Sequence, residues 1–136
     1  HYGWPYCYGN RVPDAKYGRK DFCARKTEPP VFKMQAHSAP LGLAFYTGKM
    51  FPADYRGDLF IAFHGSWNRT VPTGYKVVRV RIKDGKPAGI EDFASGWLDG
   101  FKVHGRPTDV IVGPDGALFV SDDGADRIYR ISYAPR

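Results

Sequence analysis

Four side chains with binding chemistry stand near the ends of short apolar runs in this 136-residue chain. His37 and Arg106 each come shortly before such a run, and Trp67 and Arg69 lie in the polar stretch that follows another. An arginine can hold a carboxylate through two parallel hydrogen bonds, and an indole can stack on a planar ring or shape a sugar subsite. These residue types suit a small carboxylated or planar ligand.

The chain shows no pattern typical of a complete catalytic centre. It has no Ser/His/Asp or Cys/His order, no glycine-rich loop for phosphate, and no paired carboxylates beside an evident cleft. Asp122 and Asp123 precede Gly124 at the end of a predicted strand, where they either cap a turn or bind calcium. Two carboxylates alone do not make a calcium site, so we assign no metal ligand and no catalytic residue.

The two cysteines, Cys7 and Cys23, lie in one turn-rich stretch and lack the spacing of zinc ligands. We expect a local disulfide between them, with two free buried thiols as the alternative. Disulfides persist in oxidising compartments, so this expectation favours a periplasmic or secreted protein.

The net charge of +6 admits an anionic partner. The basic residues are scattered, however, and the densest group, residues 19–26, is interrupted by Asp21. No nucleic-acid-binding motif accompanies them, so we expect a solvated basic surface and no nucleic-acid partner. The sequence contains neither a transmembrane stretch nor a signal peptide.

Composition favours short strands over long helices, because the chain has 16 glycines, 11 prolines and 15% aromatic residues. Residues 1–30 show no regular period, and we expect an irregular excursion that the disulfide staples. Beyond them, short apolar or alternating runs predict strands at 41–46, 58–63, 75–82, 89–97, 108–112, 117–121 and 127–133.

The predicted strands repeat in order. The run 41–46 aligns with 108–112, 58–63 with 117–121, and 75–82 with 127–133. Repeats of this size, each a meander of three or four antiparallel strands, are typical of β-propeller blades.

We therefore predict an all-β fold, a partial β-propeller with one blade over residues 31–100 and a partial terminal blade over 101–136. The second blade lacks an outer strand and would be completed from elsewhere in the chain. A small β-sandwich is the main alternative, but it does not explain the repeat. A propeller needs at least about four blades to close, and the chain starts at His1 without a methionine, so we expect it to be part of a longer protein.

Five segments also carry a resemblance to a known family: residues 2–5 (YGWP), 37–42 (HSAPLG), 64–69 (HGSWNR), Gly105-Arg106-Pro107 with Asp109, and Pro114-Asp115-Gly116 with Ser121-Asp122-Asp123. In this order they resemble the glucose/sorbosone dehydrogenase family, and the chain looks like its C-terminal third. The resemblance implies a six-bladed propeller that uses pyrroloquinoline quinone (PQQ), a planar cofactor with three carboxylates, to oxidise a sugar or polyol.

The resemblance also suggests roles for individual residues. It implies that Arg106 contacts the cofactor, although Arg106 could instead pair with Asp109. Thr108 stands where some relatives have a second arginine.

The other three assignments come from neighbouring loops. His37 is implied as a polar cofactor contact, or else as a donor to a backbone carbonyl. Arg69 could replace the charge of a lysine that some relatives carry in its loop. Trp67 either stacks on a ring or packs on a neighbouring loop.

The family's catalytic histidine and its calcium-binding loop lie in blades that precede the YGWP segment. We therefore expect calcium to bind outside this chain and the 136 residues to be inactive alone. The implied partners are the remaining blades of the propeller, a small sugar or polyol, and a cytochrome as electron acceptor. The alternative function is a non-catalytic propeller module that binds carbohydrate or protein.

Overall fold

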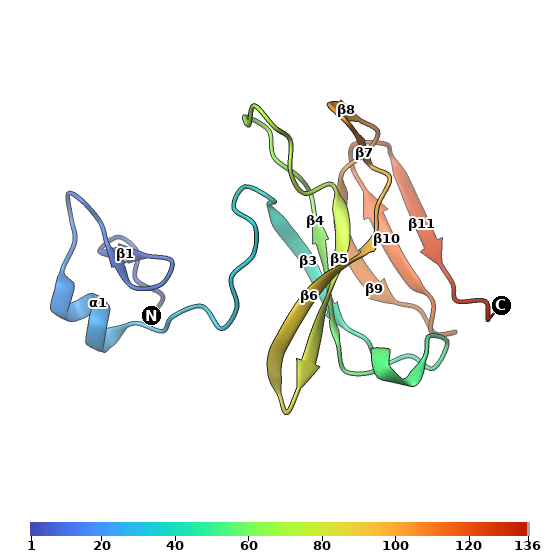
Figure 1. Cartoon of the computed structure of the whole chain (residues 1–136), viewed down its shortest axis with the longest axis horizontal. Coiled ribbons are helices and arrows are strands. Elements are labelled where there is room, and N and C mark those ends of the chain that lie inside the picture. Colours follow the sequence, from blue (N-terminus) through green and yellow to red (C-terminus); the bar gives the residue numbers. More distant parts are fainter. Residues whose placement is uncertain (136) are drawn as a thin grey trace. The chain divides into compact units, whose positions relative to one another are not determined.

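The computed structural model describes residues 1–135, and they form two compact units. The first unit comprises His1–Lys33, and the second starts at Met34. Figure 1 traces both units with their elements labelled. No helix in residues 1–135 has the length and apolar character needed to cross a membrane.

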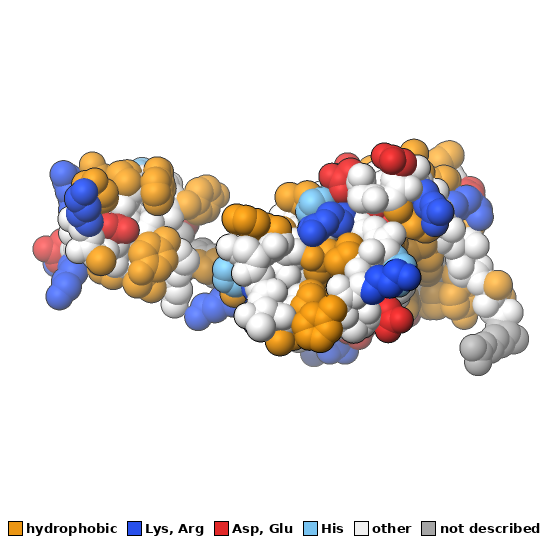
Figure 2. Space-filling model, turned by 90° about the horizontal axis from the view of Figure 1, so that it is seen from above, with side chains coloured by type: hydrophobic (Ala, Val, Ile, Leu, Met, Phe, Trp, Pro, Cys, Tyr) orange, Lys and Arg blue, Asp and Glu red, His pale blue; other side chains and the backbone are white. Residues whose placement is uncertain are grey.

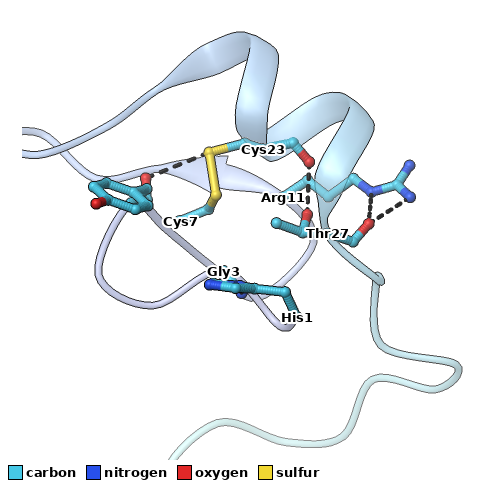
Figure 3. Close-up of a disulfide and its surroundings, with 7 residues drawn as sticks. His1, Gly3, Cys7, Arg11, Cys23 and Thr27 are labelled. Atoms are coloured by element: carbon cyan, nitrogen blue, oxygen red, sulfur yellow. Dashed lines mark hydrogen bonds between the residues drawn. A yellow bond between two sulfur atoms is a disulfide. The ribbon is translucent and has the colours of Figure 1, made fainter.

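The first unit contains a small hairpin, β1 (Cys7–Tyr8) and β2 (Val12–Pro13), and one helix, α1 (Lys20–Lys26). The predicted disulfide is confirmed: Cys7 of β1 is bonded to Cys23 of α1 (Figure 3). The Arg11 guanidinium donates two hydrogen bonds to the Thr27 carbonyl, at 3.0 and 2.7 Å, and ties the hairpin to the end of the helix.

The prediction of an irregular N-terminal stretch misses this helix. A helix of 7 residues is too short to show a clear 3.6-residue period in the sequence. Cross-links to the hairpin hold it instead, namely the disulfide and an edge-to-face contact between Phe22 and Tyr6 at 5.2 Å. Local tertiary contacts therefore determine the helix more than its sequence pattern does.

The second unit begins with a four-stranded antiparallel meander, in the order β3-β4-β5-β6. Its elements are β3 (Pro40–Phe45), β4 (Leu59–Phe63), β5 (Lys76–Lys83) and β6 (Lys86–Ala94), with a short 3-10 helix, η1 (Ala53–Tyr55), between β3 and β4. These strands match the four predicted runs between residues 41 and 97, with shifts of a few residues at their ends.

A second, three-stranded meander follows, in the order β9-β10-β11. It consists of β9 (Pro107–Val112), β10 (Leu118–Asp122) and β11 (Arg127–Ile131), and a two-residue hairpin precedes it, β7 (Leu98–Asp99) with β8 (Lys102–Val103). Within residues 1–135 no strand pairs with the outer edge of β11. The all-β fold and the partial propeller of about two blades are confirmed.

The two sheets pack against each other, with β9 in contact with β3 and β4. The core between them is built from buried apolar side chains of both sheets, which include Phe60 and Val77 from the first and Val110, Leu118 and Val120 from the second. A second cluster, with Ile61, Phe63, Val78 and Val80, lies on the opposite face of the first sheet. Successive residues of a strand point to opposite faces, so β4 and β5 are buried on both.

That opposite face also exposes apolar side chains on β3, the strand at one edge of the first sheet. Leu43 and Phe45 of β3 are 57% and 55% exposed, and Leu43 pairs with Ile61 of the second cluster. Figure 2 shows hydrophobic side chains reaching the visible surface between basic and acidic ones. Apolar side chains on both faces are expected for a propeller blade, because each blade packs between two others.

Candidate functional site

Four loops meet at one end of the two sheets, the upper end in Figure 1. They precede β3, follow β4, precede β9 and follow β10. Pairing of Pro40 with Phe63 brings the first two together, and pairing of Pro107 with Asp122 brings the last two together. Hydrogen bonds between the two pairs of loops join them into one site, and Arg106 makes most of these bonds.

The Arg106 guanidinium lies against three successive backbone carbonyls of the loop after β4. It donates to those of His64 at 3.5 Å, Gly65 at 3.4 Å and Ser66 at 3.4 Å, and to the Tyr75 hydroxyl at 3.2 Å. All four acceptors are uncharged. None of the ion pairs among the described residues involves Arg106, and Asp109, its possible partner in the sequence, accepts a hydrogen bond from the Val110 N–H. No carboxylate among the described residues therefore neutralises the positive charge of Arg106.

A buried carboxylate fixes the backbone of Arg106. Asp122 Oδ1 accepts hydrogen bonds from the N–H groups of Arg106 at 2.7 Å, Gly124 at 3.0 Å and Ala125 at 2.9 Å, while Oδ2 accepts from the Tyr129 hydroxyl at 3.2 Å. Asp122 thus caps the turn after β10, as its position before Gly124 predicts. The same carboxylate links that turn to the loop that carries Arg106.

His64 and Asp123 form a second polar pair at this end of the sheets. Nε2 of His64 lies 2.8 Å from Oδ1 of Asp123. The hydrogen bond from His64 lowers the pKa of the Asp123 carboxyl below its ordinary value, so the carboxylate stays ionised at neutral pH. An imidazole that a carboxylate orients is an arrangement suited to accepting a proton.

The other predicted site residues lie on the same loops and form no hydrogen bond with Arg106. Arg69 follows β4 and donates to the Ala36 carbonyl at 3.4 Å, next to His37. His37 itself is exposed and has a left-handed backbone with φ of 66°. Trp67 is 85% exposed, so its indole is open to solvent. His37, Arg69 and Trp67 are thus exposed, and we call them the rim of the site, whereas Arg106 is half-buried.

Sequence reasoning did not assign His64, Asp123 or Tyr75 to the site. The repeat does contain a signal for the first two, because His64 and Asp123 each follow the second strand of their own repeat unit. Equivalent positions in neighbouring blades lie at the same end of the propeller. Tyr75 has no comparable signal in the repeat. Its position depends on the left-handed backbone of Gly74 and Tyr75, which the sequence pattern does not show.

The donor set fits an anionic organic cofactor better than a metal ion. Arg106 offers an unneutralised guanidinium, and its Nε has no acceptor among the described residues. Within residues 1–135, no three His, Cys, Asp or Glu side chains are placed to hold a metal ion together. Because the two NH2 groups already have protein acceptors, a PQQ carboxylate would be matched by the positive charge and the Nε–H of Arg106.

The sequence and the fold were compared with known proteins. A family model described as TrAA12-like matches residues 9–134. An uncharacterized protein of Borreliella burgdorferi is 39% identical over 138 residues, which cover 98% of this chain and 36% of that protein.

Solved structures with the same fold include two sugar dehydrogenases. The holo form of the pyranose dehydrogenase PQQ domain from Coprinopsis cinerea has 25% sequence identity and a TM-score of 0.74, over 97% of this chain and 40% of that one. The apo form of the soluble aldose sugar dehydrogenase from Escherichia coli has 26% identity and a TM-score of 0.59, over 100% of this chain and 35% of that one. The chain spans between a third and two fifths of these relatives, and the resemblance predicted from its motifs is confirmed.

Proposed function

The chain belongs to the TrAA12-like family, and on that premise we propose that it is the cofactor- and substrate-lining part of a PQQ-dependent dehydrogenase that oxidises a sugar or related polyol. The names of the structural relatives, a pyranose dehydrogenase and an aldose sugar dehydrogenase, support this substrate class. The observation that carries the proposal is the guanidinium of Arg106, whose acceptors among the described residues are all uncharged, so that its positive charge and its Nε–H remain unmatched.

Each side chain of the site has a separate role in this proposal. Arg106 holds a carboxylate of PQQ, and Arg69 and His37 add polar contacts from the rim. Trp67 presents an exposed indole on which a pyranose ring can stack. Hydride acceptance is the chemistry that PQQ supplies when bound.

The proton of the substrate hydroxyl needs a separate acceptor. The resemblance to glucose/sorbosone dehydrogenases assigns that role to a histidine in earlier blades. The His64–Asp123 pair provides a second candidate within this chain, because the carboxylate orients the imidazole beside the loop that holds Arg106. A neutral His64 would take the proton at one ring nitrogen and share the resulting charge with Asp123.

We further propose the setting in which this segment works. The four-stranded sheet belongs to a blade over residues 31–100 and the three-stranded sheet to a partial terminal blade over 101–136, completed by the remaining blades of the same protein. Calcium binds in those blades, and a cytochrome accepts the electrons. The disulfide supports a periplasmic or secreted location.

A cofactor titration tests the proposal. PQQ, with calcium, is added to the longest natural form of the protein and to the 136-residue chain, and binding is followed by the quinone absorbance. We expect the long form to bind and Arg106→Ala to weaken binding severely. Arg81→Ala is the matched control, since it removes an exposed arginine from the other end of β5.

Two outcomes would change the assignment. Absence of PQQ binding by either form would favour the alternative function, a propeller module that binds carbohydrate or protein without catalysis. PQQ-dependent dye reduction by the 136-residue chain alone would contradict our expectation that this chain is inactive without the other blades.

A further inference from the structure

We propose that Tyr75 is a positioning residue whose hydroxyl holds the Arg106 guanidinium in the orientation that binds a ligand carboxylate. This inference rests on the proposed function, in which Arg106 binds an anionic cofactor. It concerns a residue that precedes β5 and belongs to the core between the two sheets.

The hydrogen bonds of Arg106 single out Tyr75. Among the described residues, the Tyr75 hydroxyl is the only side-chain acceptor of Arg106, and its distance of 3.2 Å is the shortest of the four. The three carbonyls lie at 3.4 to 3.5 Å, near the outer limit for a hydrogen bond. The guanidinium also lies 4.9 Å from the centre of the Tyr75 ring, within range of a cation–π contact.

Tyr75 is itself held in place. Its side chain is buried, and its hydroxyl donates a hydrogen bond to the Ser66 carbonyl. Gly65 packs so closely that an added Cβ would lie 2.6 Å from the ring carbons. The Tyr75 backbone has φ of 56°, a conformation that a bulky residue adopts rarely and only where its surroundings fix it.

The Tyr75 hydroxyl oxygen is the atom through which the fixed Tyr75 side chain orients Arg106. The Tyr75 oxygen donates to Ser66 and accepts from Arg106, so it links the loop after β4 to the residue before β9. Without the hydroxyl, the guanidinium would keep only its longer hydrogen bonds and would be more mobile in the free protein. Ligand binding would then have to restrict that motion, at a cost in conformational entropy. A hydrogen bond to a charged group contributes enough that its loss should weaken ligand binding on the order of tenfold.

Tyr75→Phe removes the hydroxyl and keeps the ring. The matched control is Tyr46→Phe, because the buried Tyr46 hydroxyl also makes hydrogen bonds, to the Gly116 carbonyl at 2.8 Å and from the Phe51 N–H at 2.9 Å. Both variants should lower the thermal midpoint by similar amounts. Only Tyr75→Phe should weaken PQQ binding, measured by absorbance titration of the longest natural form with calcium present.

A double-mutant cycle separates positioning from general damage. If Tyr75 acts through Arg106, then Tyr75→Phe should weaken PQQ binding about tenfold in the native protein and not at all in an Arg106→Met background. An equal loss in both backgrounds would overturn the inference, because Tyr75 would then act without Arg106. Unchanged PQQ affinity in Tyr75→Phe, together with weak binding by Arg106→Met, would also overturn the inference. That result would leave the proposed function intact. Unchanged affinity in Arg106→Met would instead overturn the role of Arg106 and, with it, that of Tyr75.

Discussion

Gly42 of β3 and Asp109 of β9 approach each other so closely that an added Cβ on Gly42 would lie 2.5 Å from the Asp109 Cα. This contact sets the distance between the inner strands of the two sheets. We expect Gly42→Ala to destabilise the protein by about 2 kcal/mol, because the backbone of β9 must move to admit the methyl group. Urea unfolding measures the loss.

Gly89→Ala is the matched control for that substitution. Gly89 also lies in a strand, β6, but the nearest atom to its added Cβ is the far end of the flexible Arg81 side chain, at 2.8 Å. The arginine can move aside, so the free energy of unfolding should change little. A similar loss in both variants would show that the Gly42–Asp109 contact has no special importance.

The hydrogen bonds that Asp122 accepts should contribute more to stability than its negative charge does. Asp122→Ala leaves the N–H groups of Arg106, Gly124 and Ala125 without their acceptor, so we expect a loss of about 3 kcal/mol in the free energy of unfolding. Asp122→Asn keeps an acceptor oxygen and should lose only about 1 kcal/mol. Equal losses would mean that the negative charge, and not the set of hydrogen bonds, holds the turn.

The disulfide should hold the first unit and leave the second unaffected. Cys7 and Cys23 are separated by 16 residues, and a cross-link over a loop of this length contributes about 3 kcal/mol. In Cys7→Ser/Cys23→Ser we expect rapid trypsin cleavage within residues 1–33 and unchanged protection of the β-sheets. Thiol labelling of the native, unreduced protein should find no free cysteine, and finding two would contradict the disulfide.

The Asp115–Arg130 pair predicts a pH-dependent contribution to stability. The hydrogen bond from Arg130, followed by that from the Ala117 N–H, lowers the Asp115 pKa below its ordinary value of 3.8. The folded state therefore favours the carboxylate, and this stabilisation is present above pH 3.8 and lost as the pH falls through the folded pKa. The difference in unfolding free energy between the native protein and Asp115→Asn should shrink over that range.

Arg130→Gln tests the assigned cause. It removes the largest contribution to the shift and keeps the Asp115 carboxyl and its backbone hydrogen bond. The pH dependence of its stability should therefore resemble that of Asp115→Asn more than that of the native protein. An unchanged pH profile would assign the shift to the turn backbone instead.

The strands could be predicted because each carries a strong local signal. Val78, Val80 and Ile82 alternate with Arg79 and Arg81, and β5 forms where that alternation predicts it. The helix α1 and the hairpin β7–β8 could not, because they are short and depend on contacts outside their own sequence.

The site shows the same limit. Arg106 is predicted from the family resemblance, which implies a cofactor-contacting arginine just before a strand, but the contact between His64 and Asp123 joins residues 59 apart in the chain. That contact depends on how the two sheets pack, which no local pattern encodes. Only the equivalence of the two residues within the repeat indicates that they share one end of the fold.

The His64–Asp123 pair makes the sharpest functional prediction. If His64 accepts the substrate proton, His64→Gln should lower kcat by about 10²- to 10⁴-fold in the longest natural form and leave PQQ affinity unchanged. Asp123→Asn should have a smaller effect in the same direction, because it keeps an acceptor for the imidazole but removes the charge that stabilises its protonated form.

Asp126→Asn is the control for that pair, since it removes an exposed carboxylate from the same turn. Its kcat should match that of the native protein. Native kcat in His64→Gln would place the base outside this chain, in the preceding blades that the family resemblance implies. Loss of PQQ affinity together with kcat would instead mean that His64 serves the cofactor site, because its own carbonyl accepts from Arg106.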